Sequence, residues 1–183
     1  MKIHRAKADA KSYQWIMPSV QEDDLLDLLT FDCEAKSQFW VEANWYCFNP
    51  KQKKGNFYTL GSSSSFAFDK EVYESNLFPL LEMAGEILPI QLGMETLYVM
   101  NILECVNTLN DEKTDWETYP DGSRRKISNY YFHNDRISES SLFKIPQTSK
   151  TEILTYSGVK DPEDEFKSLY EKLNFSGLIF ERL

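Results

Sequence analysis

The amino-acid sequence predicts an α+β fold, in which mostly antiparallel β-sheets carry about three packed helices in a single domain of residues 1–183. Three observations predict this class. Short segments rich in aromatic and β-branched residues alternate with turn residues, as is typical of strands. Other segments repeat apolar residues at helical spacing behind a residue that can cap a helix. No linker or internal repeat divides the chain, and its 42% hydrophobic content is enough for a core.

The first sixty residues are expected to form three strands and one short helix. A strand over 13–17 should end at Pro18, and the spacing from Ser19 to Glu22 is that of a capping box, which predicts a helix through 23–29. The aromatic stretch 39–48 is typical of a strand, which Asn49 and Pro50 should end. After a turn at 53–56, residues 57–60 are expected to form the next strand.

The central part is expected to contain one longer helix and one buried strand. Asp69 can cap a helix over 70–84, Pro79 should kink it or split it in two, and Gly85 should end it. Residues 97–106 repeat apolar side chains at helical spacing, yet their composition favours a strand. We predict a buried strand there.

The last third is expected to hold a hairpin, three further strands and a helix. Pro120, Asp121 and Gly122 form a strong hairpin turn signal, with a returning strand over 126–132. Strands are predicted over 142–145, 153–156 and 178–180. Asp161 followed by Pro162 predicts the start of a helix, whose apolar stripe runs from position 166 to 173.

The net charge is concentrated in the middle of the chain. Residues 61–120 contain eleven acids against two bases, and this difference equals the whole formal charge of −9. An uneven distribution of charge creates a directed field, which favours a basic partner. The acidic balance argues against nucleic acid as a ligand, because neutralising phosphates requires a surplus of Lys and Arg.

No motif in the sequence specifies a reaction. The two histidines are far apart and the three cysteines lack the spacing of a metal site, so we expect no metal and no cofactor. Cys105 and His133 could form a nucleophile and its base, but an inert core thiol is the simpler interpretation of Cys105. The many acids leave open a hydrolase that uses an acidic cluster, although abundance alone does not make a catalytic pair.

One loop combines acids with aromatic residues, which suits an interface with a protein that is attracted by charge. We predict partner binding by Asp111, Glu112, Asp115, Trp116, Glu117 and Tyr119. The alternative is that Trp116 faces the core at the start of a hairpin strand. Two basic clusters, at 51–54 and 124–126, are interpreted as solvated hairpin ends.

The sequence also indicates where the protein acts. No apolar stretch is long enough to cross a bilayer, and the first residues lack the apolar core of a signal peptide. The cysteines are interpreted as reduced thiols. We therefore expect a cytoplasmic protein that contacts no membrane.

The order of short motifs along nearly the whole chain resembles bacterial immunity protein family eleven, which is found in polymorphic-toxin gene clusters. The matching segments are KKGNF (53–57), FDKEVY (68–73), EILPI (86–90), YVMNILECV (98–106), LNDEKT (109–114), LFKIP (142–146), DEFK (164–167) and FSGLIF (175–180). This resemblance implies a non-catalytic protein that binds one cognate toxin domain and blocks it by occlusion. Because many such toxins are basic nucleases, it implies a basic partner.

Two alternatives to this function stay open at the level of sequence. One is the hydrolase with an acidic cluster described above. The other is a structural or accessory interaction module that forms a homodimer, which an extended apolar patch would favour.

Overall fold

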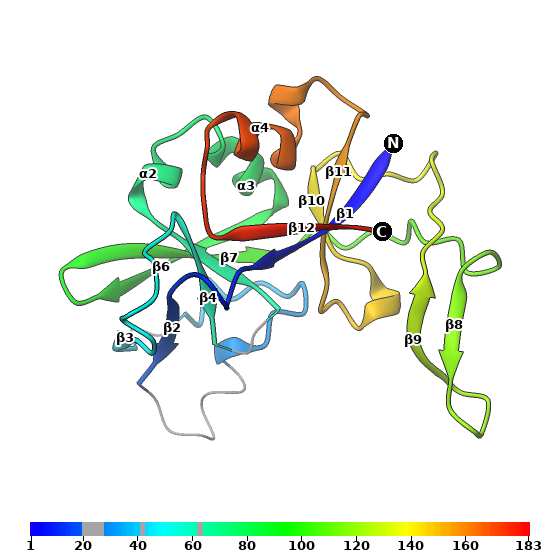
Figure 1. The fold of residues 1–183 in the computed structure, drawn as a ribbon, viewed down its shortest axis with the longest axis horizontal. Helices are drawn as coiled ribbons and strands as arrows, with labels where there is room; N and C mark the ends of the chain where they lie inside the picture. Colours follow the sequence, from blue (N-terminus) through cyan, green and yellow to red (C-terminus); the bar gives the residue numbers. More distant parts are fainter. Residues whose placement is uncertain (20–27, 41–42, 62–63) are drawn as a thin grey trace.

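A computed structural model describes residues 1–19, 28–40, 43–61 and 64–183. Within these residues it contains twelve strands, in mostly antiparallel sheets, and three α-helices, which confirms the predicted α+β class. The helices gather on one side of the sheets, and one two-stranded hairpin stands apart from the rest (Figure 1).

A six-stranded sheet forms one half of the molecule. Its spatial order is β3 (Trp45–Cys47), β2 (Trp15–Pro18), β4 (Phe57–Leu60), β5 (Phe66–Phe68), β7 (Glu95–Ile102) and β6 (Gly85–Leu92). A bridge between Asn44 and Gln91 joins the two outer strands, and the Trp40 indole donates to the Pro89 carbonyl at 2.9 Å. The sheet therefore curls round into a partly closed barrel, which removes most of its open edge.

Alternate residues of the central strands face opposite sides of this barrel wall. Tyr58, Ala67 and Val99 belong to the cluster inside the barrel, which also contains Ile16 and Trp45. Their neighbours point outward to a second cluster, whose barrel members include Phe57, Phe66, Phe68, Met100 and Ile102. Because both faces are buried, β4, β5 and β7 are almost continuously apolar.

A four-stranded antiparallel sheet covers the outside of the barrel. Its order is β10 (Leu142–Phe143), β11 (Ile153–Ser157), β1 (Lys2–Ala8) and β12 (Leu178–Arg182). Ala6 on β1 faces the barrel cluster, whereas Ile3 belongs to a third cluster with Leu154 and Tyr156. This sheet therefore separates the main core from a smaller core at the base of the hairpin.

Phe57 lies where the two sheets meet. Its ring centroid is 5.4 Å from that of Phe66, 5.5 Å from that of Tyr170 and 6.2 Å from that of Phe166. Its backbone N–H donates to the Ser176 carbonyl at 2.9 Å. The chain between α4 (Phe166–Lys172) and β12 is thus fastened to β4 by both side-chain packing and backbone contact.

The predicted helix over 70–84 is split in two, as Pro79 indicated. Helix α2 (Lys70–Tyr73) is capped by Asp69, whose carboxylate accepts the Val72 N–H at 3.0 Å, and α3 (Phe78–Ala84) begins with Pro79 in its first turn. Gly85 ends α3, and a Cβ there would lie 2.0 Å from the Asn101 carbonyl oxygen. The predicted buried strand over 97–106 is confirmed as β7, which ends at Ile102.

Three predicted elements differ from the structure. The strand over 39–48 is reduced to β3, and Phe39 is 80% exposed in a turn. The returning hairpin strand is β9 (Arg124–Asn129), not 126–132. Asp161 precedes a 3-10 turn, Pro162–Asp164, and not the α-helix, which begins at Phe166. Glu165 separates the two, and its carboxylate accepts the N–H groups of residues 158–160. Most of the predicted helix through 23–29 lies outside the described residues.

A fully buried lysine lies between the barrel and the four-stranded sheet. Lys144 has no exposed surface, and its Nζ donates to the Phe31 carbonyl at 2.5 Å and to Ser64 Oγ at 3.4 Å. Burial lowers its pKa to about 8, against the smaller opposing effect of nearby Cys33, Asp32 and Cys105. The charged form of Lys144 is therefore costly in the folded state.

A substitution at Gly177 tests the contact between the two sheets. It has a φ of +105°, and a Cβ there would lie 2.1 Å from the Phe57 carbonyl oxygen. We expect Gly177→Ala to lower the free energy of unfolding by about 3 kcal/mol or more, measured by urea denaturation. Gly93→Ala is the control, because Gly93 has a φ of +62° but open space around it, and it should cost roughly 1 kcal/mol. Equal losses in the two variants would contradict the close-approach explanation.

Lys144 predicts an unusual dependence of stability on pH. Its pKa is about 8 in the folded state against 10.5 as the ordinary value, so between these values the unfolded chain binds a proton that the folded chain does not. The free energy of unfolding should therefore rise with pH across this window, by at most about 3 kcal/mol relative to Lys144→Met. Urea denaturation of both proteins from pH 7 to 10.5 measures this difference.

The exposed Lys70 provides a matched control for that experiment. Lys70→Met should follow the wild-type curve over the same pH range. A constant difference between wild type and Lys144→Met across the window would overturn the interpretation.

Candidate functional site

The predicted acidic loop lies on a hairpin that adds almost nothing to the core. Strands β8 (Asp115–Thr118) and β9 form a separate two-stranded sheet, and no residue of either strand is buried. Tyr119 N–H donates to the Ser123 carbonyl at 2.8 Å, which closes the turn predicted at Pro120–Gly122. The hairpin projects from the edge of the molecule (Figure 1).

The base of the hairpin is fastened to the smaller core. Trp116 and Ile127 pack, half-buried, against the third cluster, and a bridge pairs Leu109 with Phe132. Tyr130 extends this attachment, since its hydroxyl lies 2.8 Å from an Arg5 guanidinium nitrogen and 2.7 Å from a Glu152 carboxylate oxygen. The hairpin is thus held firmly at one end and exposed over the rest of its length.

The acids of the hairpin are matched by bases on the opposite strand. Asp111 pairs with Arg124 at 2.9 Å, and Glu117 pairs with Lys126 at 3.0 Å. The Arg124 guanidinium also lies 4.5 Å from the centroid of a Trp116 ring, a cation–π distance. With five acids and four bases over residues 111–126, the hairpin is nearly neutral.

The structure places the six predicted residues in different environments. Asp111, Glu112 and Asp115 are exposed, and Asp115 accepts from the Asn129 amide at 3.3 Å. Trp116 is half-buried against the third cluster, which is the arrangement that the alternative interpretation expected, while Tyr119 is 50% exposed. Asp111 and Glu112 lie in the turn before β8, whereas the other four lie on β8 or directly after it, with Glu117 in the ion pair described above.

The sequence analysis did not include the bases of β9, residues 124–126, among the candidate site residues. The cluster 124–126 was assigned to a solvated hairpin end, although it lies across the predicted turn from the acids. Pairing the two arms of that turn in register would have placed bases opposite acids. The exposed Tyr131 was also missed, because it follows β9 and belongs to no sequence motif that indicates binding.

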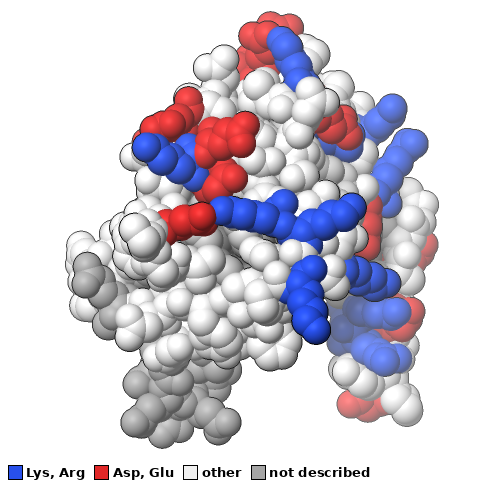
Figure 2. Space-filling model, turned by 60° about the vertical axis from the view of Figure 1, so that its left-hand side comes forward, with Lys and Arg blue, Asp and Glu red and all other residues white. Residues whose placement is uncertain are grey.

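Acidic side chains do not form one continuous surface on the face that Figure 2 presents. There, Lys and Arg side chains spread across the middle and right, while Asp and Glu side chains lie in separate groups at the top, the upper left and the right (Figure 2). Several acids of residues 61–120 have structural partners: Asp69 caps α2, Glu95 pairs with Lys54 at 2.7 Å, and Glu86 accepts the Lys36 N–H at 2.7 Å. Burial acts to raise the pKa of Glu86, but hydrogen bonds from Lys36, Ser37 and Asn101 outweigh it, and the pKa is lowered.

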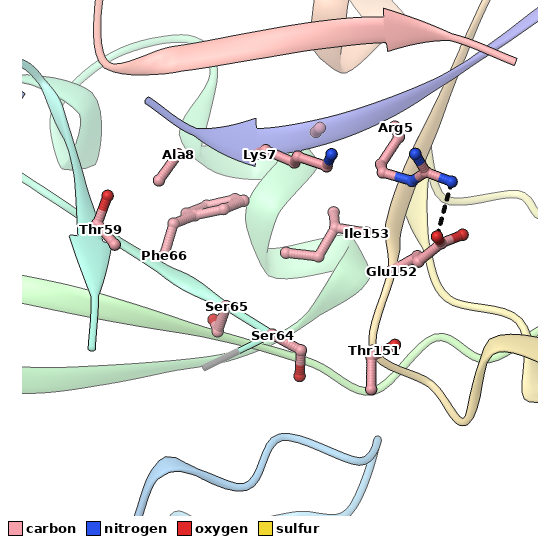
Figure 3. Close-up of a pocket in the computed structure, with 11 residues that line it drawn as sticks. Arg5, Lys7, Ala8, Thr59, Ser64, Ser65, Phe66, Thr151, Glu152 and Ile153 are labelled. Atoms are coloured by element: carbon pink, nitrogen blue, oxygen red, sulfur yellow. Dashed lines mark ion pairs between the residues drawn. The ribbon is translucent and has the colours of Figure 1, made fainter. Parts of the chain in front are cut away.

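A cavity of about 240 Å³ opens between β1 and the barrel. Among the described residues, Glu152 is the one carboxylate in its lining, and it forms an ion pair of 2.7 Å with Arg5 (Figure 3). A second depression, of about 510 Å³, is lined by Tyr73 and Tyr98, stacked at 4.2 Å, and by Phe78 and Glu82 among others. Within the described part of the chain, neither cavity is lined by the two carboxylates that an acid–base hydrolase requires.

Metal ligands and disulfides are equally scarce in the described part of the chain. No group of three or more His, Cys, Asp or Glu side chains there could hold a metal ion. Cys33, Cys47 and Cys105 are free thiols. Among the same residues, no helix has the length and apolar character needed to cross a membrane.

Arg124 tests whether the ion pairs order the hairpin. We expect Arg124→Ala to speed amide hydrogen exchange in β8 and β9 by up to about fivefold, because an exposed ion pair and a cation–π contact contribute together about 1 kcal/mol. Global unfolding should change little. Arg125→Ala is the control, since both contacts of Arg125, 3.7 Å to Glu117 and 5.9 Å to the Tyr119 ring, are longer than those of Arg124. Equal exchange rates in both variants and wild type would show that the hairpin is ordered without these pairs.

Comparisons with known proteins provide no relative from which a function could be carried over. No family model matches the chain, and no curated protein sequence matches it.

Proposed function

We propose that this chain is a cytoplasmic immunity-type protein that binds a basic toxin domain and blocks it by occlusion, without catalysis. The observation that carries the proposal is the β8–β9 hairpin, in which neither strand has a buried residue. A two-stranded hairpin is marginally stable on its own, so an ordered one that packs on the smaller core only through Trp116 and Ile127 is best explained by recognition.

The hairpin offers two means of contact. Each strand pairs only with the other in its sheet, so each has an outer edge of backbone N–H and C=O groups that a partner strand can extend. Tyr119 and Tyr131 are 50% and 43% exposed and provide aromatic surface next to these edges. A partner that adds a strand would gain backbone hydrogen bonds and aromatic contact together.

Charge has two separate roles in this proposal. The formal charge of −9 accelerates encounter with a basic partner, and this effect should weaken as salt concentration rises. The hairpin itself is nearly neutral because its ion pairs match acids with bases. Affinity is therefore expected from edge pairing and aromatic contact, and attraction over distance from the molecule as a whole.

A toxin domain encoded by a neighbouring gene, which the proposal predicts, is the probe. We expect the purified chain to co-purify with it and to protect cells that express it. Tyr119→Ser should weaken the complex roughly tenfold, as expected for an aromatic contact near the centre of an interface. Isothermal titration measures this change.

Tyr46→Ser is the matched control, because Tyr46 is 44% exposed on β3, and it should bind as wild type does. Absence of a complex together with absence of protection would end the proposal. Self-association through the hairpin, seen by sedimentation and lost in Tyr119→Ser, would support the homodimeric module instead.

A further inference from the structure

The aromatic depression lies where helices α2 and α3 meet the outer face of strands β6 and β7. Its volume of about 510 Å³ is that of an ordinary ligand pocket, which is enough space for a side chain of another molecule. The side chains that give it its character are Tyr73, Phe78, Glu82, Ile87, Pro89 and Tyr98.

Alternation along β6 places apolar surface in this depression. Leu88 and Ile90 are buried inside the barrel, so Ile87 and Pro89 face outward. Ile87 and Tyr98 pack against the outer cluster but stay only half-buried, and Pro89 is exposed. The described part of the chain therefore leaves an apolar face open at this place.

The aromatic rings of the depression hold one another in position. The Tyr73 ring is stacked on the Tyr98 ring with centroids 4.2 Å apart, and its centroid lies 4.4 Å from that of Phe78. The Asp69 cap fixes the start of α2, which carries Tyr73. A ligand that enters therefore finds aromatic surface already ordered, and its binding costs little further ordering of the protein.

The free polar groups of the depression can all accept hydrogen bonds. Within the described residues, Glu82 takes part in no ion pair, and the hydroxyls of Tyr73 and Tyr98 have no hydrogen-bond partner. No described Lys or Arg lines the depression, and the neighbouring Lys70 is paired with Glu74 at 3.3 Å. A cation that enters thus meets a carboxylate and no opposing base.

The surrounding sequence strengthens this preference for a cation. Between Lys70 and Lys113 the chain has eight acids and no base, and the whole lining of the depression comes from this segment. The local field therefore attracts positive charge, and it acts over the longer distances at which a partner approaches.

We propose that this depression binds an arginine side chain presented by a partner protein, with the guanidinium against the aromatic rings and Glu82. A guanidinium has several N–H donors and no acceptor, which matches a lining whose free polar groups can accept. It is planar, weakly hydrated and able to contact aromatic rings while it pairs with a carboxylate. The methylene groups of the same side chain can cover Ile87 and Pro89.

The same reasoning favours arginine over lysine. A lysine ammonium is compact and strongly hydrated, so it loses more hydration energy when it enters an aromatic site, and it cannot pair with a carboxylate through two parallel N–H groups. The site is also separate from the hairpin, because α2 and α3 lie on the opposite side of the molecule from β8 and β9 (Figure 1). The inference therefore does not depend on the function proposed for the hairpin.

The experiment titrates the whole chain, labelled with ¹⁵N, with the capped peptide Gly-Arg-Gly and follows the backbone amide signals by NMR. We expect saturating shifts in α2, α3, β6 and β7, with a Kd in the millimolar range, as is usual for a single side chain. The Gly-Lys-Gly peptide should bind about threefold more weakly or less. The peptide with citrulline, the neutral analogue of arginine, should not saturate.

Variants assign the binding to this depression. Glu82→Gln should weaken arginine binding about fivefold, through loss of an ion pair at a partly exposed site. Tyr73→Leu should weaken it to a similar extent. Glu112→Gln is the matched control, because Glu112 is also exposed and forms no ion pair within the described residues but lies before β8. It should bind as wild type does, and so should Tyr119→Ser.

Several outcomes would overturn the proposal. These are the absence of saturating shifts, shifts centred on the hairpin, equal affinity for the arginine peptide and either comparison peptide, and unchanged affinity in Glu82→Gln. The Glu82→Gln change is on an exposed side chain, so it keeps the test valid even if Tyr73→Leu folds poorly. None of these outcomes bears on toxin binding through the hairpin, which Tyr119→Ser tests separately.

Discussion

The aromatic packing around Phe57 is the contact on which the rest of the structure depends. Phe57 belongs to the barrel wall, yet its ring packs against Phe166 and Tyr170 of α4, and its backbone is bonded to Ser176. The barrel interior is a separate cluster, so the barrel and the four-stranded sheet are joined chiefly through this outer layer. Close approach of the backbone at Gly177 makes that junction possible, because any side chain there would push β12 away from β4.

Several acids of this protein are paired with bases or with backbone N–H groups and do not gather into one negative surface. The eleven acids of residues 61–120 predict a single negative surface, but the fold uses Asp69 and Glu86 to satisfy backbone N–H groups and pairs Glu95 with Lys54. On the hairpin, opposing acids and bases reduce the local charge. Under the proposed function, net charge acts on a partner at long range, whereas the hairpin makes the contact.

The sequence predicts local features well and long-range pairing poorly. Pro79 and Gly85 identify the break and the end of the helical region, and the Pro120–Gly122 signal identifies the hairpin, because turn chemistry acts within a few residues. Strand β1 was missed because its apolar residues are few and small, with Ile3 on one face and Ala6 and Ala8 on the other. Strand β6 was missed because Pro89 is unusual within a strand. The matching of Arg124 with Asp111 depends on tertiary structure, which periodicity cannot reveal.

The position of β1 has a consequence for biosynthesis. It lies between β11 and β12, and its residue Ile3 is paired with Tyr156, roughly 150 residues further along the chain. While the nascent polypeptide emerges from the ribosome, the barrel strands can associate long before either neighbour of β1 exists. Until then β1 is an unsatisfied strand with two open edges, so completion of the second sheet must wait for synthesis of the last strands and requires that β1 be kept from pairing elsewhere.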